Sequence, residues 1–336
     1  MAKYGVSDQN KVMFYYESGA YGTASGGTNW IGLVTNHAID ENENVVPLRY
    51  VAGAGRNVNQ FVQTSKEVEG TITYHPQDLR FLKFALGSCV DGGSPTYEHR
   101  LKENDSCDSS AEIANQVLPS FQIEDAHGCT AGSVFKRTVT GAMVDTMTLN
   151  FPEGEMMSID LGYTAQNITY ASGDAAAVTK RTNRPFLAMD YQYFIGSPDT
   201  GTQPYPNVKT ASLEIAENLS KPNYCDGNRY RGEPIPTSRD YTFNVTLNEN
   251  NNQTHVLYDK YFIGGSAFNC EIRAKTTNSS LGSAFIYLSG CELVNMDAPT
   301  TAEGENENTL TIRPTKVDGT VFDDIQYWNA DSGVGF

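Results

Sequence analysis

The sequence contains three short blocks that each occur twice, in the same order. The block pairs are 39–42 with 215–218, 64–68 with 237–241, and 153–155 with 303–305. The second pair is displaced by 173 positions (237 − 64) and the third by 150 (303 − 153). Self-similarity of this kind predicts that the chain is built from two copies of one structural unit.

The length of the chain agrees with a duplication. At 336 residues it is too long for one ordinary hydrophobic core and suits two domains of about 150 residues each. From the repeated blocks we predict a first domain over 12–170 and a second over 185–317. Residues 318–336 are then expected to form a C-terminal tail that docks on a partner or frays.

Alternation of apolar and polar residues dominates both copies and predicts half-buried β-strands. The strands are expected at 67–74, 139–149, 157–165, 240–247, 285–296 and 309–312. Only 79–86 and 255–263 are typical of short amphipathic helices. Their predicted apolar stripes contain Leu82, Ala85 and Leu86 in the first, and Leu257, Tyr261 and Phe262 in the second. The predicted fold is therefore mainly β, with two tandem β-sandwich or barrel domains and one flanking helix each.

Two long polar segments, 43–63 and 219–236, occupy matching places in the copies. Long loops of this kind in a compact domain are usually functional or disordered. We interpret them as arms that order against a neighbouring subunit, and mobile surface loops are the alternative. The expected contact residues are Pro47, Arg49, Tyr50, Arg56, Tyr224, Arg229, Tyr230 and Arg231. The segment 88–133 is longer than its counterpart and is predicted to be an insertion on the outer surface.

The charge balance restricts the possible partners. The formal net charge is −16 and the pI is about 4.7, which argues against a protein that grips phosphate backbones. Residues 1–17 show no signal peptide, and no apolar run approaches the length of a membrane span. We therefore expect a protein that is made in the cytoplasm and does not insert into a membrane.

No catalytic motif is found in the sequence, so we predict neither an enzyme nor a cofactor. The acidic group Asp40, Glu41 and Glu43 could hold a hard cation, but acidic strand ends are usually only solvated, and no metal is predicted. The six cysteines match no common zinc pattern. A disulfide among Cys89, Cys107 and Cys129 stays open as an alternative to free thiols.

Several short motifs resemble those of the tail tube proteins of tailed bacteriophages and archaeal viruses. They are Tyr21-Gly22-Thr23, Trp30-Ile31-Gly32-Leu33, the arm opening Asn44-Val45-Val46-Pro47, the strand–helix order of 68–86, and the closing pattern 303–312. Together they cover most of the chain. Segment 88–133 and the cysteines depart from the family pattern.

The resemblance implies that sheets of neighbouring subunits join around a ring into a β-lined tube, and that long arms contact the adjacent ring. It also implies a virion protein, assembled in the host cytoplasm, that conducts the genome. Its implied partners are itself, the tail terminator, tail tip or baseplate proteins, and transiently the tape measure protein and DNA. Because single-domain relatives form hexameric rings, two fused domains predict a homotrimeric, pseudo-hexameric ring.

Two other functions stay open. A tail hub or baseplate ring protein also fuses two tube-like domains, but it would form one ring without polymerising. A cell-surface, glycan-binding β-protein would present exposed aromatic residues in a shallow groove and require secretion.

Overall fold

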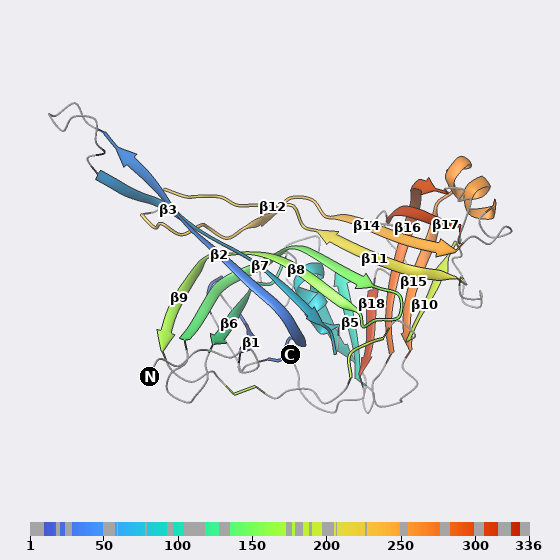
Figure 1. Cartoon of the computed structure of the whole chain (residues 1–336), viewed down its shortest axis with the longest axis horizontal. Helices are drawn as coiled ribbons and strands as arrows, with labels where there is room; N and C mark the ends of the chain where they lie inside the picture. Colours follow the sequence, from blue (N-terminus) through green and yellow to red (C-terminus); the bar gives the residue numbers. More distant parts are fainter. Residues whose placement is uncertain are drawn as a thin grey trace.

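The computed structural model is mainly β, as the sequence predicts, with most strands in one large antiparallel sheet (Figure 1). The structure describes residues 10–17, 21–23, 29–49, 58, 60–77, 79–92, 97–103, 118–127, 135–172, 177–178, 184–187, 190–196, 205, 207–225, 227–248, 255–275, 283–298, 306–314 and 324–329.

The first half of the chain contains nine strands and one short helix. In chain order the strands are β1 (Lys11–Tyr16), β2 (Leu33–Leu48), β3 (Gln60–His75), β4 (Gly87–Gly92), β5 (Tyr97–Glu103), β6 (Phe121–His127), β7 (Phe135–Phe151), β8 (Ser158–Ala165) and β9 (Asn167–Ser172). The helix is a 3-10 turn, η2 (Arg80–Leu82), followed by α1 (Lys83–Leu86). The pairing order is β2-β3-β8-β7-β6-β1, with β9 also on β7.

The second half repeats this order. Its strands are β10 (Tyr191–Ile195), β11 (Val208–Ala216), β12 (Leu219–Ser220), β13 (Ile235–Pro236), β14 (Asp240–Asn248), β15 (Phe268–Lys275), β16 (Ser283–Asp297), β17 (Glu307–Pro314) and β18 (Asp324–Asn329), with a π-helix, η4 (Leu257–Ile263), after β14. The pairing order is β11-β14-β17-β16-β15-β10, with β18 on β16. Each strand therefore has a counterpart, except β4 and β5 in the first half and the small β12–β13 pair in the second.

The irregularities of the sheets recur as well. The register of β7 against β8 shifts between Val144 and Thr146, and that of β16 against β17 shifts between Leu293 and Asn295, a displacement of 149 (293 − 144). β2 and β11 each carry a bulge near their start, displaced by 174 (208 − 34). Bulges bend and twist a strand locally. Equal bulges at equivalent positions indicate that both halves bend their strands in the same way.

A single hydrophobic core cluster runs through both halves. In each half the apolar side of the long sheet faces the shorter strands and the helix. Phe81 and Phe84 of the first helix contact Phe121 of β6, with ring centroids 5.2 and 4.8 Å apart. In the second half Leu257 and Tyr261 are buried.

The two predicted helices are present at their expected positions, but one predicted core residue is not buried. Phe262 is 37% exposed, whereas Leu257 and Tyr261 are buried. The helix is of the π type, with Gly264 N donating to Asp259 O at 3.0 Å. A wider turn keeps residues four apart on one face and rotates the fifth away from it.

The segment 88–133 is only partly an outer insertion, so that prediction is wrong for its last part. Strand β6 lies within it, pairs with β1 and β7, and contributes the fully buried Phe121 and Ile123 to the core. Its counterpart in the second half is β15. Strands β4 and β5 are the extra elements, and β5 pairs with β18 across the two halves. Because β18 is such a strand, part of the predicted tail belongs to the sheet.

The first repeated block is displaced by two residues from the match that the sequence suggests. Asn44 Nδ2 donates to Ser65 Oγ at 2.8 Å, and Asn218 Nδ2 donates to Ser238 Oγ at 3.2 Å. The equivalent of Glu217-Asn218 is therefore Glu43-Asn44, not Glu41-Asn42. The sequence Glu41-Asn42-Glu43-Asn44 repeats itself at period two, so both alignments match equally well by sequence alone.

Candidate functional site

The two halves are joined edge to edge by backbone pairing between β7 and β11. The register runs from Thr146 opposite Ala216 to Phe151 opposite Ala211. Beyond the strands, Glu217 N donates to Asp145 O at 2.8 Å. This seam makes one continuous sheet of eight strands, in the order β2-β3-β8-β7-β11-β14-β17-β16.

A buried ion pair lies at the same seam. Arg239 Nε donates to Glu217 Oε1 at 2.7 Å, and Glu217 is 1% exposed. Arg239 also reaches the first half, where Nη2 donates to the carbonyl oxygen of Leu86 at 3.4 Å. Burial raises the pKa of Glu217 to about 6, although the Arg239 charge and hydrogen bond lower it; nearby Glu103 and Asp145 raise it.

The eight-strand sheet has one apolar and one polar face. Buried residues such as Ile72, Leu213 and Leu310 alternate with polar neighbours along every strand. The polar side chains are exposed or half-buried: Thr71, Thr73, Thr146, Thr148, Asn150, Asp160, Ser212, Glu214, Thr242, Asn244, Thr246, Thr309 and Thr311. Cross-strand hydrogen bonds order this face, including Thr73 Oγ1 and Asn150 Nδ2 to the Asp160 carboxylate, both at 2.7 Å.

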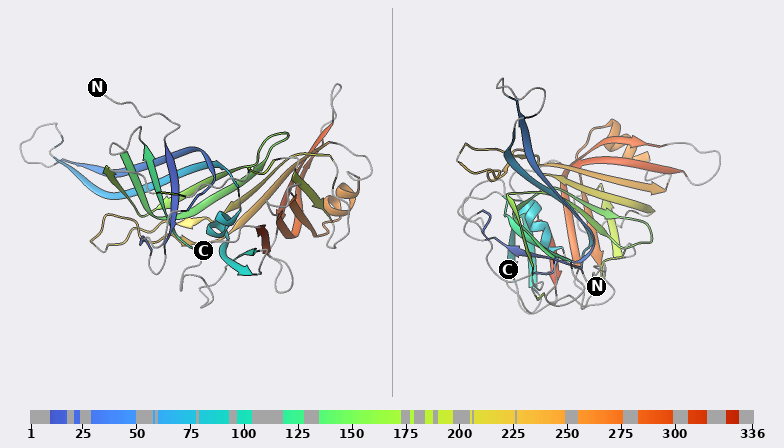
Figure 2. Two further views of the ribbon diagram at one scale, coloured as in Figure 1. Left: turned by 90° about the horizontal axis from the view of Figure 1, so that it is seen from below. Right: turned by 60° about the vertical axis from the view of Figure 1, so that its left-hand side comes forward.

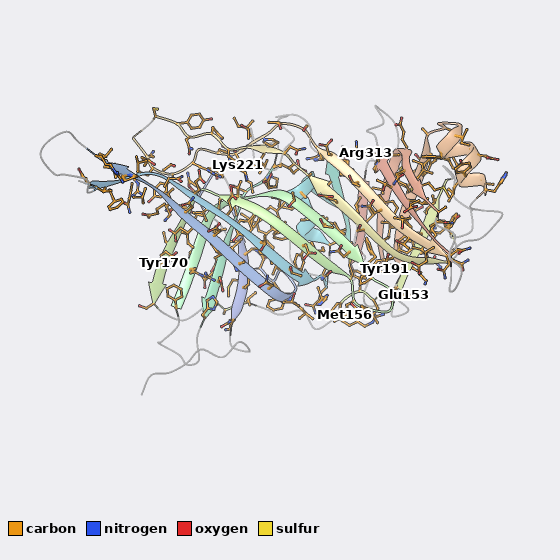
Figure 3. The ribbon with its side chains drawn as sticks, turned by 45° about the horizontal axis from the view of Figure 1, so that its top comes forward. Glu153, Met156, Tyr170, Tyr191, Lys221 and Arg313 are labelled. Carbon is orange, nitrogen blue, oxygen red and sulfur yellow. The ribbon has the colours of Figure 1, made fainter. Side chains whose placement is uncertain are left out.

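The second arm folds back over the first half of the same chain. Arg231 Nη2 lies 2.8 Å from Glu67 Oε1, and Arg231 Nη1 lies 3.0 Å from Glu69 Oε1. Lys221 Nζ also lies 3.1 Å from Glu69 Oε1, and Lys66 N donates to Arg229 O at 2.8 Å. Lys221 is labelled on this arm in Figure 3. The second arm thus binds a neighbouring half within the chain, and contact with another chain stays a prediction for its residues.

Individual residues of the second arm differ in accessibility. Arg231 is buried and is occupied by its ion pairs within the chain. Tyr224 and Tyr230 are 53% and 43% exposed, and Arg229 lies at a loose 3.5 Å from Glu43 Oε2. Of the residues that we expected to contact another subunit, Arg231 is therefore the one already committed to an internal contact.

The first arm is a β-hairpin rather than a loop over much of its length. Strands β2 and β3 stay paired out to Leu48 opposite Gln60, and the hairpin projects beyond the body of the molecule (Figure 1). Pro47 and Arg49 are exposed near its end, whereas Tyr50 and Arg56 lie outside the described residues. Polar composition misled the sequence interpretation, because a protruding hairpin needs cross-strand pairing rather than a buried face.

The hairpin also exposes apolar residues that the sequence analysis did not single out. Val45, Val46 and Phe61 are 46%, 44% and 67% exposed. Val46 lies opposite Val62, and Pro47 opposite Phe61, so these side chains gather at one end of the hairpin. Exposed apolar patches of this kind mark interaction sites. The Val-Val-Pro run was the available signal.

A buried cluster of charged groups fixes β2 to β6. Asp125 Oδ2 lies 3.2 Å from His37 Nδ1, Asp125 Oδ1 lies 3.0 Å from His127 Nε2, and Asp125 also pairs with Arg137. Burial raises the pKa of Asp125, but the His37 hydrogen bond and charge and the Arg137 charge lower it to about 2. The carboxylate is thus neutralised inside the fold. Among the described residues, no group of three or more His, Cys, Asp or Glu side chains is arranged to hold a metal ion.

Comparison with known proteins follows the same direction as the geometry. A phage tail tube protein family matches residues 8–320, nearly the whole chain. The chain therefore belongs to the phage tail tube protein family, and it is a structural component of a virion tail that associates with itself into a tube. No curated protein matches the sequence. In the described part of the chain, no helix has the length and apolar character needed to cross a membrane.

Proposed function

We propose that three chains form a closed ring with pseudo-sixfold symmetry, and that such rings stack into the tail tube. The observation that carries this proposal is the β7–β11 seam, which joins two equivalent four-strand units edge to edge. Three chains would contribute six such units. The two halves are then the two tube domains that the repeat predicts. Closing the ring also removes sheet edges, which are otherwise open to uncontrolled pairing.

The polar face of the eight-strand sheet would line the bore through which the genome passes. It carries threonines and asparagines together with the exposed carboxylates of Asp40, Glu214 and Asp297. Acidic and neutral polar groups do not retain a phosphate backbone, since DNA binding relies on Lys and Arg to release counterions. The net charge of −16 is consistent with a bore that lets DNA slide.

The first-arm hairpin would contact the adjacent ring in the stack. Its exposed Val45, Val46 and Phe61 supply apolar area, and Pro47 and Arg49 lie beside them. The tail terminator and the tail tip or baseplate proteins would bind at the two ends of the stack, and the tape measure protein would occupy the bore during assembly.

Imaging of purified particles by electron microscopy, with averaging of end views, tests this proposal. We expect long tubes whose rings contain three chains. Six chains per ring would contradict the trimer, and single rings that never stack would favour a tail hub or baseplate protein instead. Monomers under all assembly conditions would contradict a tube protein.

A deletion tests the arm separately. Removing Val51–Asn59, a segment that lies largely outside the described residues, should leave a folded protein that no longer forms tubes. Phe61→Ala should weaken stacking in the same direction, and Tyr170→Ala, which changes an exposed aromatic residue on β9, serves as its control. Normal tubes from the deletion variant would show that the arm does not join rings.

A further inference from the structure

The eight-strand sheet ends in two edges that have no partner within the described part of the chain. β2 pairs only with β3, and the C-terminal part of β16 pairs only with β17. These strands are the counterparts of β11 and β7, which pair with each other at the internal seam. The free edges are therefore the two edges that, in the other half, form a seam.

Burial differs between the paired and unpaired copies in the way that a missing neighbour would cause. Met147 on β7 is fully buried, whereas its equivalent Met296 on β16 is only half-buried. Leu213 on β11 is 1% exposed, whereas its equivalent Ile39 on β2 is half-buried. Apolar side chains that face the core are thus left partly uncovered at both ends of the sheet.

The helices show the same asymmetry. Every residue of α1 is buried, and the carbonyl of Leu86 is contacted by Arg239 from the second half. The equivalent helix η4 packs beside β16 at the free end of the second half (Figure 2) and exposes four apolar residues. These are Val256, Tyr258, Phe262 and Ile263, between 37% and 65% exposed. An apolar surface of this kind, continuous with an open sheet edge, fits a protein partner.

We infer that the edge of β16 pairs with β2 of a second copy of this chain, in the register of the internal β7–β11 seam. This inference rests on the proposed ring and adds its residue-level contacts. The displacements of 149 and 174 transfer each internal pair to the seam between chains. Ala298 then lies opposite Ile39, Met296 opposite Glu41, and Asn295 opposite Asn42.

The same register brings two carboxylates together. Asp297 of one chain lies opposite Asp40 of the next, where the internal seam has Thr148 opposite Glu214. Within the chain, Asp40 already lies opposite Glu69, whose charge is balanced by Lys221 and Arg231, and Asp297 lies opposite Thr309. Like charges directly opposite each other destabilise strand pairing. The seam between chains is thus weaker than the seam within the chain at this row.

Disulfide trapping tests the register. Asp40→Cys combined with Asp297→Cys should cross-link neighbouring chains in assembled particles under mild oxidation. Non-reducing gels should then show a ladder that ends at the trimer. The internal equivalent, Thr148→Cys with Glu214→Cys, should cross-link within one chain without raising its mass. The offset pair, Asp40→Cys with Asn295→Cys, and each single variant control for native thiols.

The outcomes separate this inference from the proposed ring. Particles that assemble normally but cross-link through the offset pair, or through neither pair, would overturn the register alone. A ladder that ends at six chains would support the register and contradict the trimer. Wild-type chains that form no rings in the microscope would overturn both.

A charge exchange gives an independent measurement. Asp297→Lys should tighten ring association several-fold because its ammonium group would face Asp40, and Asp40→Lys should do the same. The double variant places two ammonium groups opposite each other, so its association should return to or below that of wild type. Additive gains in the double variant would show that the two residues do not meet.

Discussion

Gly141 and Gly290 occupy the same position in the two halves, 149 residues apart (290 − 141), and both have a left-handed backbone, with φ of 65° and 57°. Each sits where its long strand leaves one partner strand for another. Each amide donates to a side chain, Gly141 N to Glu17 Oε1 at 2.7 Å and Gly290 N to Asn269 Oδ1 at 3.1 Å. The duplication has therefore kept the bend that lets one strand serve both the long sheet and the shorter strands.

Substitution at this bend should be costly. Gly141→Ala would place a Cβ 2.8 Å from both Gln166 Cβ and the Tyr21 ring, in addition to the left-handed strain. We expect a loss of about 2–4 kcal/mol in the free energy of unfolding, from strain of about 1–2 kcal/mol and overpacking of about 1–3 kcal/mol. Denaturant titration measures it.

Gly154→Ala is the matched control. Gly154 has a φ of 71°, but a Cβ there would meet nothing within 4 Å. It should therefore cost only the backbone strain, about 1–2 kcal/mol. Equal losses in the two variants would show that close packing at Gly141 contributes nothing.

The second arm should depend on one arginine rather than the other. Arg231→Ala removes the partner of Glu67 and Glu69 and should cost about 1–3 kcal/mol. Arg229→Ala removes an exposed, 3.5 Å pair with Glu43 and should cost less than about 1 kcal/mol. Hydrogen exchange over 219–236 should rise sharply in the first variant only. Unchanged exchange in Arg231→Ala would show that other contacts hold the arm.

Much of the fold was predictable because period-two alternation identifies strands directly. β7, β8, β14, β16 and β17 lie where alternation predicts them, and the repeated blocks mark equivalent strands. Strand β6 was missed because its neighbours are rich in Cys, Ser and Asp, although Phe121 and Ile123 alternate. Local composition therefore outweighed a short apolar pattern that tertiary pairing makes decisive.

The candidate assembly surface was less predictable, because a strand pattern does not say what lies on its polar side. Thr71 and Glu214 could have faced solvent, a partner or a bore with the same sequence. Ion pairs between distant segments, such as Arg231 with Glu69, also have no local signature. Only the pairing of β7 with β11 shows how one half meets the next.

Stability should fall with rising pH between about 4.5 and 6 because of Glu217. Its pKa is raised from 4.5 to about 6 in the fold, first by burial, so the folded state binds the proton more tightly than the unfolded state. The contribution is fully present below pH 4.5 and is lost as pH rises through 6, amounting to about 2 kcal/mol.

Comparison with Glu217→Gln isolates this effect. The variant cannot titrate at this position, so its free energy of unfolding should fall less between pH 4.5 and 7 than that of wild type. Histidines titrate in both proteins and cancel in the difference. Asp125, with its pKa lowered to about 2, acts only in more acidic solution, where its contribution is lost as pH falls. Identical pH profiles would show that Glu217 has an ordinary pKa.

Basic residues on the polar face should make the tube retain DNA. Glu214→Lys with Thr309→Lys changes two exposed residues of this face on β11 and β17. Tubes assembled with short duplex DNA should then hold nuclease-protected DNA, and retention should weaken steeply with salt as counterion release requires. Tyr170→Lys on β9 places the charge elsewhere, and DNA bound there should stay open to nuclease. Equal protection in wild type and the double variant would show that this face does not line the bore.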